Sequence, residues 1–321
     1  MNQIEYTENI FFCYTCPIIS LIGLILSLFC LGVLMNSQFK QNFYNFLKME
    51  IFFITLDLLI GTIKPVFHCF YSPTRGKYYS VIYFIYFINY AASVLEQSVF
   101  LCNILATVEF YILISNKQQS KYNILKRINY TIFGLIVFIS SSLLFLYQIF
   151  EFNIKSIKIN QPPFYNSSSA SDFYIIEKSV FSYSIFYRIN QISGFVIRDF
   201  INLFILTILN IMIYLTIRKS LRKKLEIQNN VSTSVKNVDN SLKLMVFLGS
   251  LNNIIGRIPI AIWSILDTVY DYENTHLLLK VAVLTVNLSF GFHFILYFIT
   301  NKLFRKVFLN YLSFVSIRRR N

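Results

Sequence analysis

The segment Phe11–Met35 reads FFCYTCPIISLIGLILSLFCLGVLM and contains no charged residue. A helix that crosses the hydrocarbon core of a bilayer needs about 20 mostly apolar residues, so this segment is long enough to cross. Comparable apolar segments follow at about 47–70, 83–115, 128–150, 191–217, 242–266 and 277–300. The sequence therefore predicts an all-α membrane protein, a bundle of seven transmembrane helices over residues 11–300, flanked by segments 1–10 and 301–321.

The composition fits a chain that lies in lipid. Hydrophobic residues make up 55% of the 321 residues and charged residues only 14%, whereas about a quarter of the residues of a soluble domain are charged. The formal net charge of +14 does not indicate nucleic-acid binding, because Lys and Arg lie mostly in loops between the apolar segments. The lipid bilayer is therefore the predicted surrounding, and nucleic acid is not a predicted partner.

The distribution of Lys and Arg predicts how the helices are oriented. With the N-terminus outside, the cytoplasmic side holds 19 of the 29 Lys and Arg residues and the outer side holds nine. Basic residues accumulate on the cytoplasmic side of membrane proteins. We therefore expect an extracellular N-terminus, a cytoplasmic segment 301–321 made of a short helix and a basic tail, and a multi-pass location in the plasma membrane. Segment 1–10 has no Lys or Arg, so the first helix is expected to stay as an uncleaved anchor.

Two features predict covalent modification on the outer side. Cys69 would lie near Cys13 and Cys16 at that membrane face and could form a disulfide with either of them. Asn166 begins a glycosylation sequon in the long outer loop 151–187 and is the predicted glycan site. The cysteines lack the paired spacing of a zinc site, and we predict no metal centre and no cofactor.

Polar residues within the apolar segments predict which helix faces point away from lipid. Residues three, four or seven positions apart lie on one face of a helix. Such stripes are Glu96, Asn103 and Phe110 in the third segment, Asn253, Arg257 and Ser264 in the sixth, and Ser289, His293 and Tyr297 in the seventh. Unpaired charges in hydrocarbon are costly, so these faces should point into the bundle.

Glu96 and Arg257 lie at comparable depth, counted from the cytoplasmic ends of their helices, and we expect them to form an ion pair. The pair either lies beneath a ligand pocket or merely satisfies two buried charges. Nearer the outer face, an excess of positive charge predicts a ligand with an acidic group, although Lys64 and Lys280 could also reach lipid headgroups. The residues predicted to line the pocket are Lys64, His68, Glu96, Arg198, Asp199, Arg257, Asp267 and Lys280.

Motifs spread from about Gly23 to Phe308 resemble those of rhodopsin-like G-protein-coupled receptors. They are Leu56-Asp57-Leu58-Leu59 with Pro65 in the second helix, Glu109-Phe110-Tyr111 in the third, Tyr214 with Arg218 and Arg222 in the fifth, Pro259 in the sixth, and Tyr297 with Phe304 and Arg305 at the seventh. The chain departs from the family where Phe110 replaces Arg, Arg257 replaces Trp, and His293 replaces Asn. Asn287 and Ala92 stand where opsins carry the retinal lysine and amine receptors their aspartate, so neither retinal nor a monoamine is expected.

The resemblance implies a ligand-activated receptor of a divergent invertebrate type, similar to FMRFamide-peptide receptors or chemoreceptors, whose sixth helix moves to admit a heterotrimeric G protein. It implies a sodium site and conformational switch that involve Asp57, Asn103, Pro259, Ser289, His293 and Tyr297. It implies G-protein coupling through Glu109, Phe110, Tyr111, Tyr214, Arg218, Arg222, Asp239, Phe304 and Arg305.

The sequence thus predicts a signal-transducing receptor for an extracellular peptide or a small acidic or chemosensory molecule. The alternative is a seven-helix transporter or ion channel, because ionisable residues in a membrane also mark ion pathways. No enzyme is predicted. An intramembrane protease would need two Asp residues, or Ser with His, on facing helices, and Asp57 has no evident second Asp. The chain also lacks His-x-x-x-His and Gly-x-Ser-x-Gly motifs. The identity of the ligand stays open.

Overall fold

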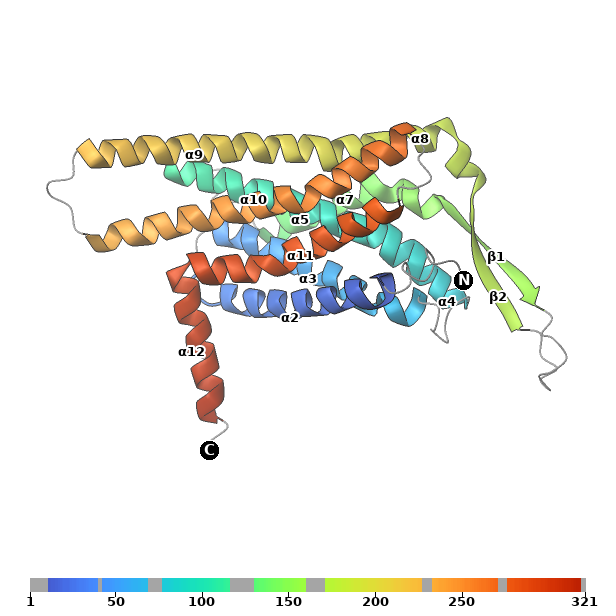
Figure 1. Cartoon of the computed structure of the whole chain (residues 1–321), viewed down its shortest axis with the longest axis horizontal. Coiled ribbons are helices and arrows are strands. Elements are labelled where there is room, and N and C mark those ends of the chain that lie inside the picture. The colour runs from blue at the N-terminus through green and yellow to red at the C-terminus, as the bar shows by residue number, and fades with distance from the viewer. Residues whose placement is uncertain are drawn as a thin grey trace.

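The chain forms a bundle of long helices that lie side by side, with a two-stranded sheet extending from one end (Figure 1). The structure is a computed structural model, and it describes residues 11–39, 42–68, 77–115, 130–159, 171–226, 233–270 and 276–318.

The elements follow one another in a simple order. The first half contains η1 (Phe11–Thr15), α2 (Cys16–Leu34), α3 (Asn42–His68), α4 (Tyr78–Ile82), η2 (Tyr83–Ala91), α5 (Ala92–Ile114), α7 (Tyr130–Phe145) and η3 (Leu146–Phe150). The strands are β1 (Phe152–Ile159) and β2 (Ser171–Lys178). The second half contains η4 (Val180–Tyr183), α8 (Ile185–Phe195), η5 (Val196–Ile201), α9 (Asn202–Glu226), α10 (Thr233–Tyr270), α11 (His276–Thr300) and α12 (Lys302–Arg318). The π-helical segments η2 and η5 join α4 to α5 and α8 to α9 without a break, so each set forms one long rod.

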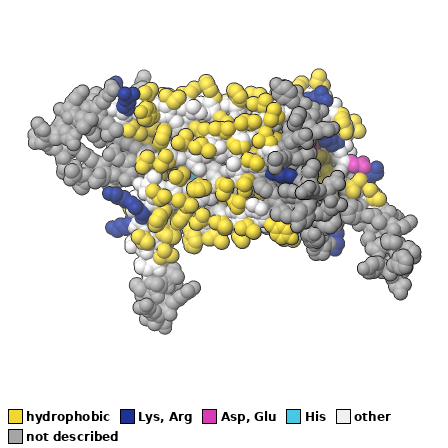
Figure 2. Space-filling view, in the orientation of Figure 1, with side chains coloured by type: hydrophobic (Ala, Val, Ile, Leu, Met, Phe, Trp, Pro, Cys, Tyr) yellow, Lys and Arg dark blue, Asp and Glu magenta, His cyan; other side chains and the backbone are white. Residues whose placement is uncertain are grey.

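Six helices among the described residues are long and apolar enough to cross a membrane. They cover Cys13–Leu34, Tyr78–Ile114, Tyr130–Phe150, Ile185–Lys219, Leu244–Leu266 and Leu278–Thr300. Their outward surface is apolar: Ile25, Leu135 and Phe204 are 47%, 55% and 63% exposed, and Figure 2 shows hydrophobic side chains over the middle of the visible face with Lys and Arg near its ends. A soluble protein would bury such a surface, so the chain is a multi-pass, all-α membrane protein.

A further long helix, α3, is not among these six. Its 27 residues include four charged ones, Lys48, Glu50, Asp57 and Lys64. It packs between α2 and α5, and Glu50 and Asp57 are buried there. Its carboxylates therefore lie within the bundle.

Several helices extend beyond the predicted bounds. The predicted segment 242–266 lies within the 38 residues of α10, and the predicted segment 191–217 lies within the rod that runs from α8 to the end of α9. Hydropathy detects only the part of a helix that is apolar enough for lipid. Polar residues that continue the same helix into water leave no such signal.

The loop 151–187 contains a hairpin that the sequence did not predict. Strands β1 and β2 pair antiparallel, with Phe152 opposite Lys178 and Ile159 opposite Ser171. The pairing depends on two segments separated in sequence, which local hydropathy does not reveal. Asn89 at the end of η2 donates a hydrogen bond to Glu151 over 3.2 Å and so ties the hairpin's base to the bundle.

The disulfide prediction left two cysteines open, and the structure distinguishes them. Cys13 is disulfide-bonded, whereas Cys16 is a buried free thiol. Cys69 lies outside the described residues.

The C-terminal helix α12 is longer than the predicted short helix and leaves the bundle at a steep angle (Figure 1). Asn301 marks the turn, because its side-chain oxygen accepts hydrogen bonds from the backbone N–H groups of Leu303 and Phe304 over 3.0 and 3.2 Å. This N-cap starts the new helix direction.

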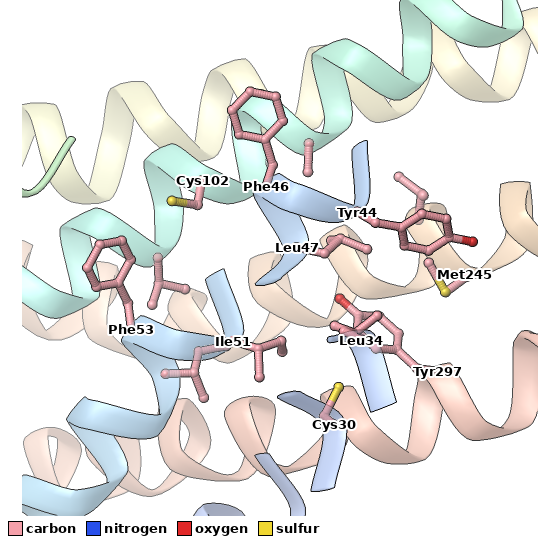
Figure 3. Close-up of a cluster of buried hydrophobic side chains, with 14 of the residues drawn as sticks. Cys30, Leu34, Tyr44, Phe46, Leu47, Ile51, Phe53, Cys102, Met245 and Tyr297 are labelled. Carbon is pink, nitrogen blue, oxygen red and sulfur yellow. The ribbon is translucent and has the colours of Figure 1, made fainter. Parts of the chain in front are cut away.

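The core lies where α2, α3, α5, α10 and α11 meet (Figure 3). Cys30 and Leu34 of α2, Met245 of α10 and Tyr297 of α11 point into one apolar cluster. Beside it, small residues allow close helix contact. A Cβ atom added at Gly256 of α10 would lie 2.5 Å from the Cβ of Ser289 on α11.

We predict that Gly256→Ala lowers the melting temperature of the detergent-solubilised protein. The added methyl group must push α10 and α11 apart, and overpacking of this kind costs about 1–3 kcal/mol. Gly32→Ala is the matched control, because a Cβ at Gly32 meets nothing within 4 Å. Equal melting temperatures for the two variants would show that the α10–α11 contact is not as tight as described.

Candidate functional site

An ion pair joins α5 to α10 in the middle of the bundle. Arg257 Nη1 lies 2.6 Å from Glu96 Oε2, and the two side chains are 3% and 17% exposed. The Arg257 guanidinium also lies over the ring of Phe100, 4.6 Å from its centroid. The predicted Glu96–Arg257 pair is confirmed, and its cation is held by both a carboxylate and an aromatic face.

Asp57 belongs to the same electrostatic group. It is buried on α3, and it lies close enough to Glu96 and Arg257 to interact with both. The Arg257 guanidinium therefore pairs with Glu96 and also attracts the Asp57 carboxylate, which lowers the cost of burying both acids.

A second polar cluster centres on Glu50, whose side chain has no exposed surface. Asn103 of α5 and Asn253 of α10 both donate hydrogen bonds to Glu50 Oε1, over 2.7 and 2.9 Å. His293 Nε2 of α11 lies 3.4 Å from the same oxygen. One carboxylate thus links α3 to three other helices.

His293 is held in place by its own helix. Its Nδ1 lies 2.9 Å from the backbone oxygen of Ser289. Ser289 in turn bonds to α10, because its hydroxyl donates to the Asn252 carbonyl over 3.0 Å and Asn252 donates to the Ser289 carbonyl over 2.8 Å. The imidazole orientation is therefore fixed by the α10–α11 contact.

The predicted polar face of α10 points inward along its length. Asn253, Arg257 and Ser264 are buried. Ser250, three residues before Asn253, is also buried and continues the same face toward the N-terminus of α10. Each contacts a different segment: Ser250 bonds to Asn210 over 2.6 Å, Asn253 to Glu50, Arg257 to Glu96, and Ser264 to Asp199 over 3.5 Å. This helix is the common member of every cluster.

Three residues implied for the sodium site have partners other than Asp57. Asn103 bonds to Glu50, His293 faces Glu50, and Ser289 bonds to Asn252. The polar centre shared by Asn103 and His293 is Glu50, which lies seven residues, about two helical turns, before Asp57 on α3.

Two of the residues predicted for the outer pocket form an ion pair with each other. Arg198 and Asp199 form two hydrogen bonds with each other, over 2.9 and 2.7 Å, and Asp199 has no exposed surface. Lys280 is buried and Lys64 half-buried. Asp199 therefore neutralises its neighbour instead of facing an open vestibule.

Two predicted coupling residues, Phe110 and Phe304, and the predicted switch residue Tyr297 are core residues here. Phe110 is buried and packs on Phe43, with ring centroids 5.7 Å apart. Tyr297 is buried between His293 and Phe304, with both ring centroids 6.0 Å from its own. Of the implied contact residues whose side chains the structure describes, Tyr214 and Arg218 are exposed, while Glu109, Tyr111 and Arg305 are half-buried.

The side chains of His68, Asp267, Arg222 and Asp239, and the whole of Asn166, lie outside the described residues. The predictions that rest on them stay predictions.

Sequence reasoning missed Glu50, the residue with the most partners in this network. A signal was present: Glu50, Asp57 and Lys64 are spaced seven apart, so they share one face of α3. The amide and hydroxyl partners Asn210, Ser250 and Asn252 gave weaker signals, because uncharged polar residues are common on any helix face.

No protein-family model matches this chain, and no curated protein matches it. Within the described part of the chain, no group of three or more His, Cys, Asp and Glu side chains could hold a metal ion.

The buried pair should show strong thermodynamic coupling. We predict that Arg257→Gln destabilises the protein more than the double variant Glu96→Gln/Arg257→Gln, because the single change leaves a buried carboxylate without its cation, at a cost of about 3–5 kcal/mol. Unfolding in detergent measures each variant, and additive effects of the two changes would contradict the prediction.

The matched control is Lys155 with Glu177 on the hairpin, a pair 3.1 Å apart whose side chains are 61% and 46% exposed. Changing both to Gln should give almost no coupling energy, since exposed pairs contribute about 0–1 kcal/mol.

Proposed function

We propose that this protein is a seven-helix receptor of the plasma membrane that transmits the binding of an extracellular ligand to a heterotrimeric G protein through movement of α10. The observation that carries the proposal is the way α10 is held. On the N-terminal side of Pro259, Ser250, Asn252 and Asn253 bond to three different helices through side chains. Such bonds can open and reclose while the backbone of α10 stays helical.

In this proposal α3 crosses the membrane as the seventh helix, with the N-terminus outside and the C-terminus in the cytoplasm. Its length supports a crossing, since 27 residues at 1.5 Å per residue exceed the hydrocarbon thickness of about 30 Å. The burial of Glu50 and Asp57 also supports it, because both carboxylates are kept from lipid.

Pro259 supplies a hinge. It has no N–H to donate, so the preceding turn of α10 loses one backbone hydrogen bond. The carbonyl left without its helical donor is that of Ile255. In the same turn the Gly256 carbonyl lies 3.3 Å from the Thr285 hydroxyl on α11, which also donates to the Ala282 carbonyl over 2.9 Å. A bend at this point would move the N-terminal half of α10 and leave the outer half in place.

The Glu96–Arg257 pair lies next to this hinge, which connects ligand binding to movement. A ligand with an acidic group would compete with Glu96 for Arg257, two positions before Pro259. Because a ligand shifts a conformational equilibrium only by its different affinity for the two states, an acid that binds Arg257 after the pair opens would favour the moved state. Peptides and small carboxylic acids are therefore the ligand classes to test.

The transporter or channel reading has weaker support. Glu50, Asp57 and Glu96 are buried acids, as in ion pathways. However, two of the buried charged residues are neutralised by a direct ion pair. Arg257 on α10 pairs with Glu96, and Asp199 on η5 pairs with Arg198. A pathway would require these contacts to open in sequence, whereas a receptor requires only that α10 move.

We predict that Ser250→Ala raises ligand-independent nucleotide exchange about fivefold on at least one G protein of a reconstituted panel. The change removes the bond that holds α10 to α9 and leaves Asn210 Oδ1 without this donor, and one lost hydrogen bond is worth about 1 kcal/mol. Thr207→Ala is the matched control, because the exposed Thr207 bonds only to the Leu203 carbonyl on its own helix.

The same vesicles are then challenged with neuropeptides and small carboxylic acids. Nucleotide exchange without solute flux supports the receptor. Uptake or current from vesicles that contain no G protein, with no exchange in their presence, would replace it with the transporter reading.

A further inference from the structure

The Glu50 carboxylate has an unusual set of neighbours. Oε1 accepts hydrogen bonds from Asn103 and Asn253, while Oε2 has no hydrogen-bond partner among the described residues. No Lys or Arg of the described chain forms an ion pair with Glu50; its one basic neighbour there is His293, at 3.4 Å. A fully buried carboxylate with amide donors alone would keep a net negative charge.

The geometry of His293 determines which of its nitrogens carries a hydrogen. A backbone carbonyl can only accept, so Nδ1, 2.9 Å from the Ser289 oxygen, must be the donor in that bond. In a neutral imidazole Nε2 then carries a lone pair. That lone pair would face an ionised carboxylate oxygen 3.4 Å away, which is repulsive in a site with no exposed surface.

We propose that Glu50 and His293 form a buried proton-binding site in which one proton, held between the carboxylate and Nε2, makes the cluster electrically neutral. The proton sits on Nε2 as part of an imidazolium, which pairs with the ionised carboxylate of Glu50. This form removes the repulsion and keeps a charged acceptor for Asn103 and Asn253.

Other titratable groups that face Glu50 do not supply a charge. They are Cys30 on α2, Cys102 on α5 and Tyr297 on α11. Thiols and phenols are neutral near pH 7, and α10 contributes the uncharged Asn253. The proton count of the cluster is therefore set by Glu50 and His293.

The protonation of this site controls how strongly α10 is bonded to α3 through Asn253 and Glu50. This consequence rests on the proposed function, in which α10 moves. The same Oε1 that faces His293 accepts the bond from Asn253, and hydrogen bonds to a charged acceptor are stronger than those to a neutral one. A second proton would leave a neutral carboxyl group beside an imidazolium, so both amide bonds weaken and a positive charge stays buried. Acidification should therefore release α10.

The proton itself is tested by nitrogen NMR of protein labelled with 15N-histidine in detergent or nanodiscs. The chain has three histidines, so the spectrum is sparse, and His293→Gln assigns the resonance. We expect Nδ1 of His293 to be protonated at neutral pH and Nε2 to be shifted toward the protonated range. In Glu50→Gln, Nε2 should return to the range of an unprotonated nitrogen.

The native spectrum alone can overturn the proposal, so it does not depend on the variant folding. An unprotonated Nδ1 together with a protonated Nε2 would describe the opposite tautomer and leave Glu50 with a net charge. An Nε2 resonance of a free, unprotonated nitrogen in the native protein would equally exclude a shared proton.

The release of α10 is tested with two native reporters, the buried free thiols Cys30 and Cys102. Alkylation of each is followed by peptide mass spectrometry in the native protein and in Glu50→Gln, at reagent concentrations high enough that opening of the bundle limits the rate. The rate in Glu50→Gln divided by the rate in the native protein then reports opening and does not depend on the ionisation of the thiols. At neutral pH we expect Glu50→Gln to react about tenfold faster, as two hydrogen bonds lose a charged acceptor. The ratio should approach one as the pH falls and the native site takes up its second proton.

Glu177→Gln, which changes an exposed acid on β2, is the control and should give a ratio of one at every pH. If the ratio of the Glu50→Gln rate to the native rate does not change with pH, the proposal that the protonation of this site controls how firmly α10 is held is wrong. Neither measurement needs a ligand or a G protein, so failure of the proton site and failure of the receptor proposal are separate results.

Discussion

A carboxylate with no exposed surface must find all its partners within the protein, and Glu50 finds them on three other helices. The cost of leaving such a group unpaired exceeds that of most single packing defects, so the helices that supply its partners are constrained to lie close together. Asn103, Asn253 and His293 come from α5, α10 and α11. The arrangement of the central helices depends on this one acceptor.

The same constraint repeats along α10 at other depths. Each inward polar residue of this helix bonds to a different neighbour, so no two contacts are redundant. These hydrogen bonds are directional and each needs a specific partner. The apolar contacts of the lipid-facing side are not directional, so they do not fix the position of the helix. A helix held in this way has a defined resting position and a small number of bonds to break, which is the physical basis for its proposed role as the moving element.

Three residues at the motif positions, Phe110, Arg257 and His293, have well-defined partners in the structure. Phe110 is buried and packs against the ring of Phe43. This apolar ring offers no carboxylate or carbonyl oxygen to a guanidinium at position 110. Arg257 pairs with Glu96 and lies over Phe100, so the charge at this position has its partners on α5. His293 faces Glu50 with an ionisable ring. An Asn at this position would present an amide, which does not ionise. Arg257 and His293 thus make charged or ionisable contacts, whereas Phe110 makes an apolar one.

The sequence by itself determined the elements that follow from local chemistry. Apolar length specified the lipid-crossing helices, and polar periodicity specified the inward faces of α5, α10 and α11, because both properties belong to one helix at a time. It also identified the Glu96–Arg257 pair, since two opposite charges at equal depth have few other ways to be satisfied. The tertiary structure alone decided that Glu50 joins four helices, that Ser289 exchanges hydrogen bonds with Asn252, and that β1 pairs with β2. Those contacts depend on the rotation, depth and spacing of segments distant in sequence, and an amide or hydroxyl group can bond to many neighbours, so packing chooses the partner.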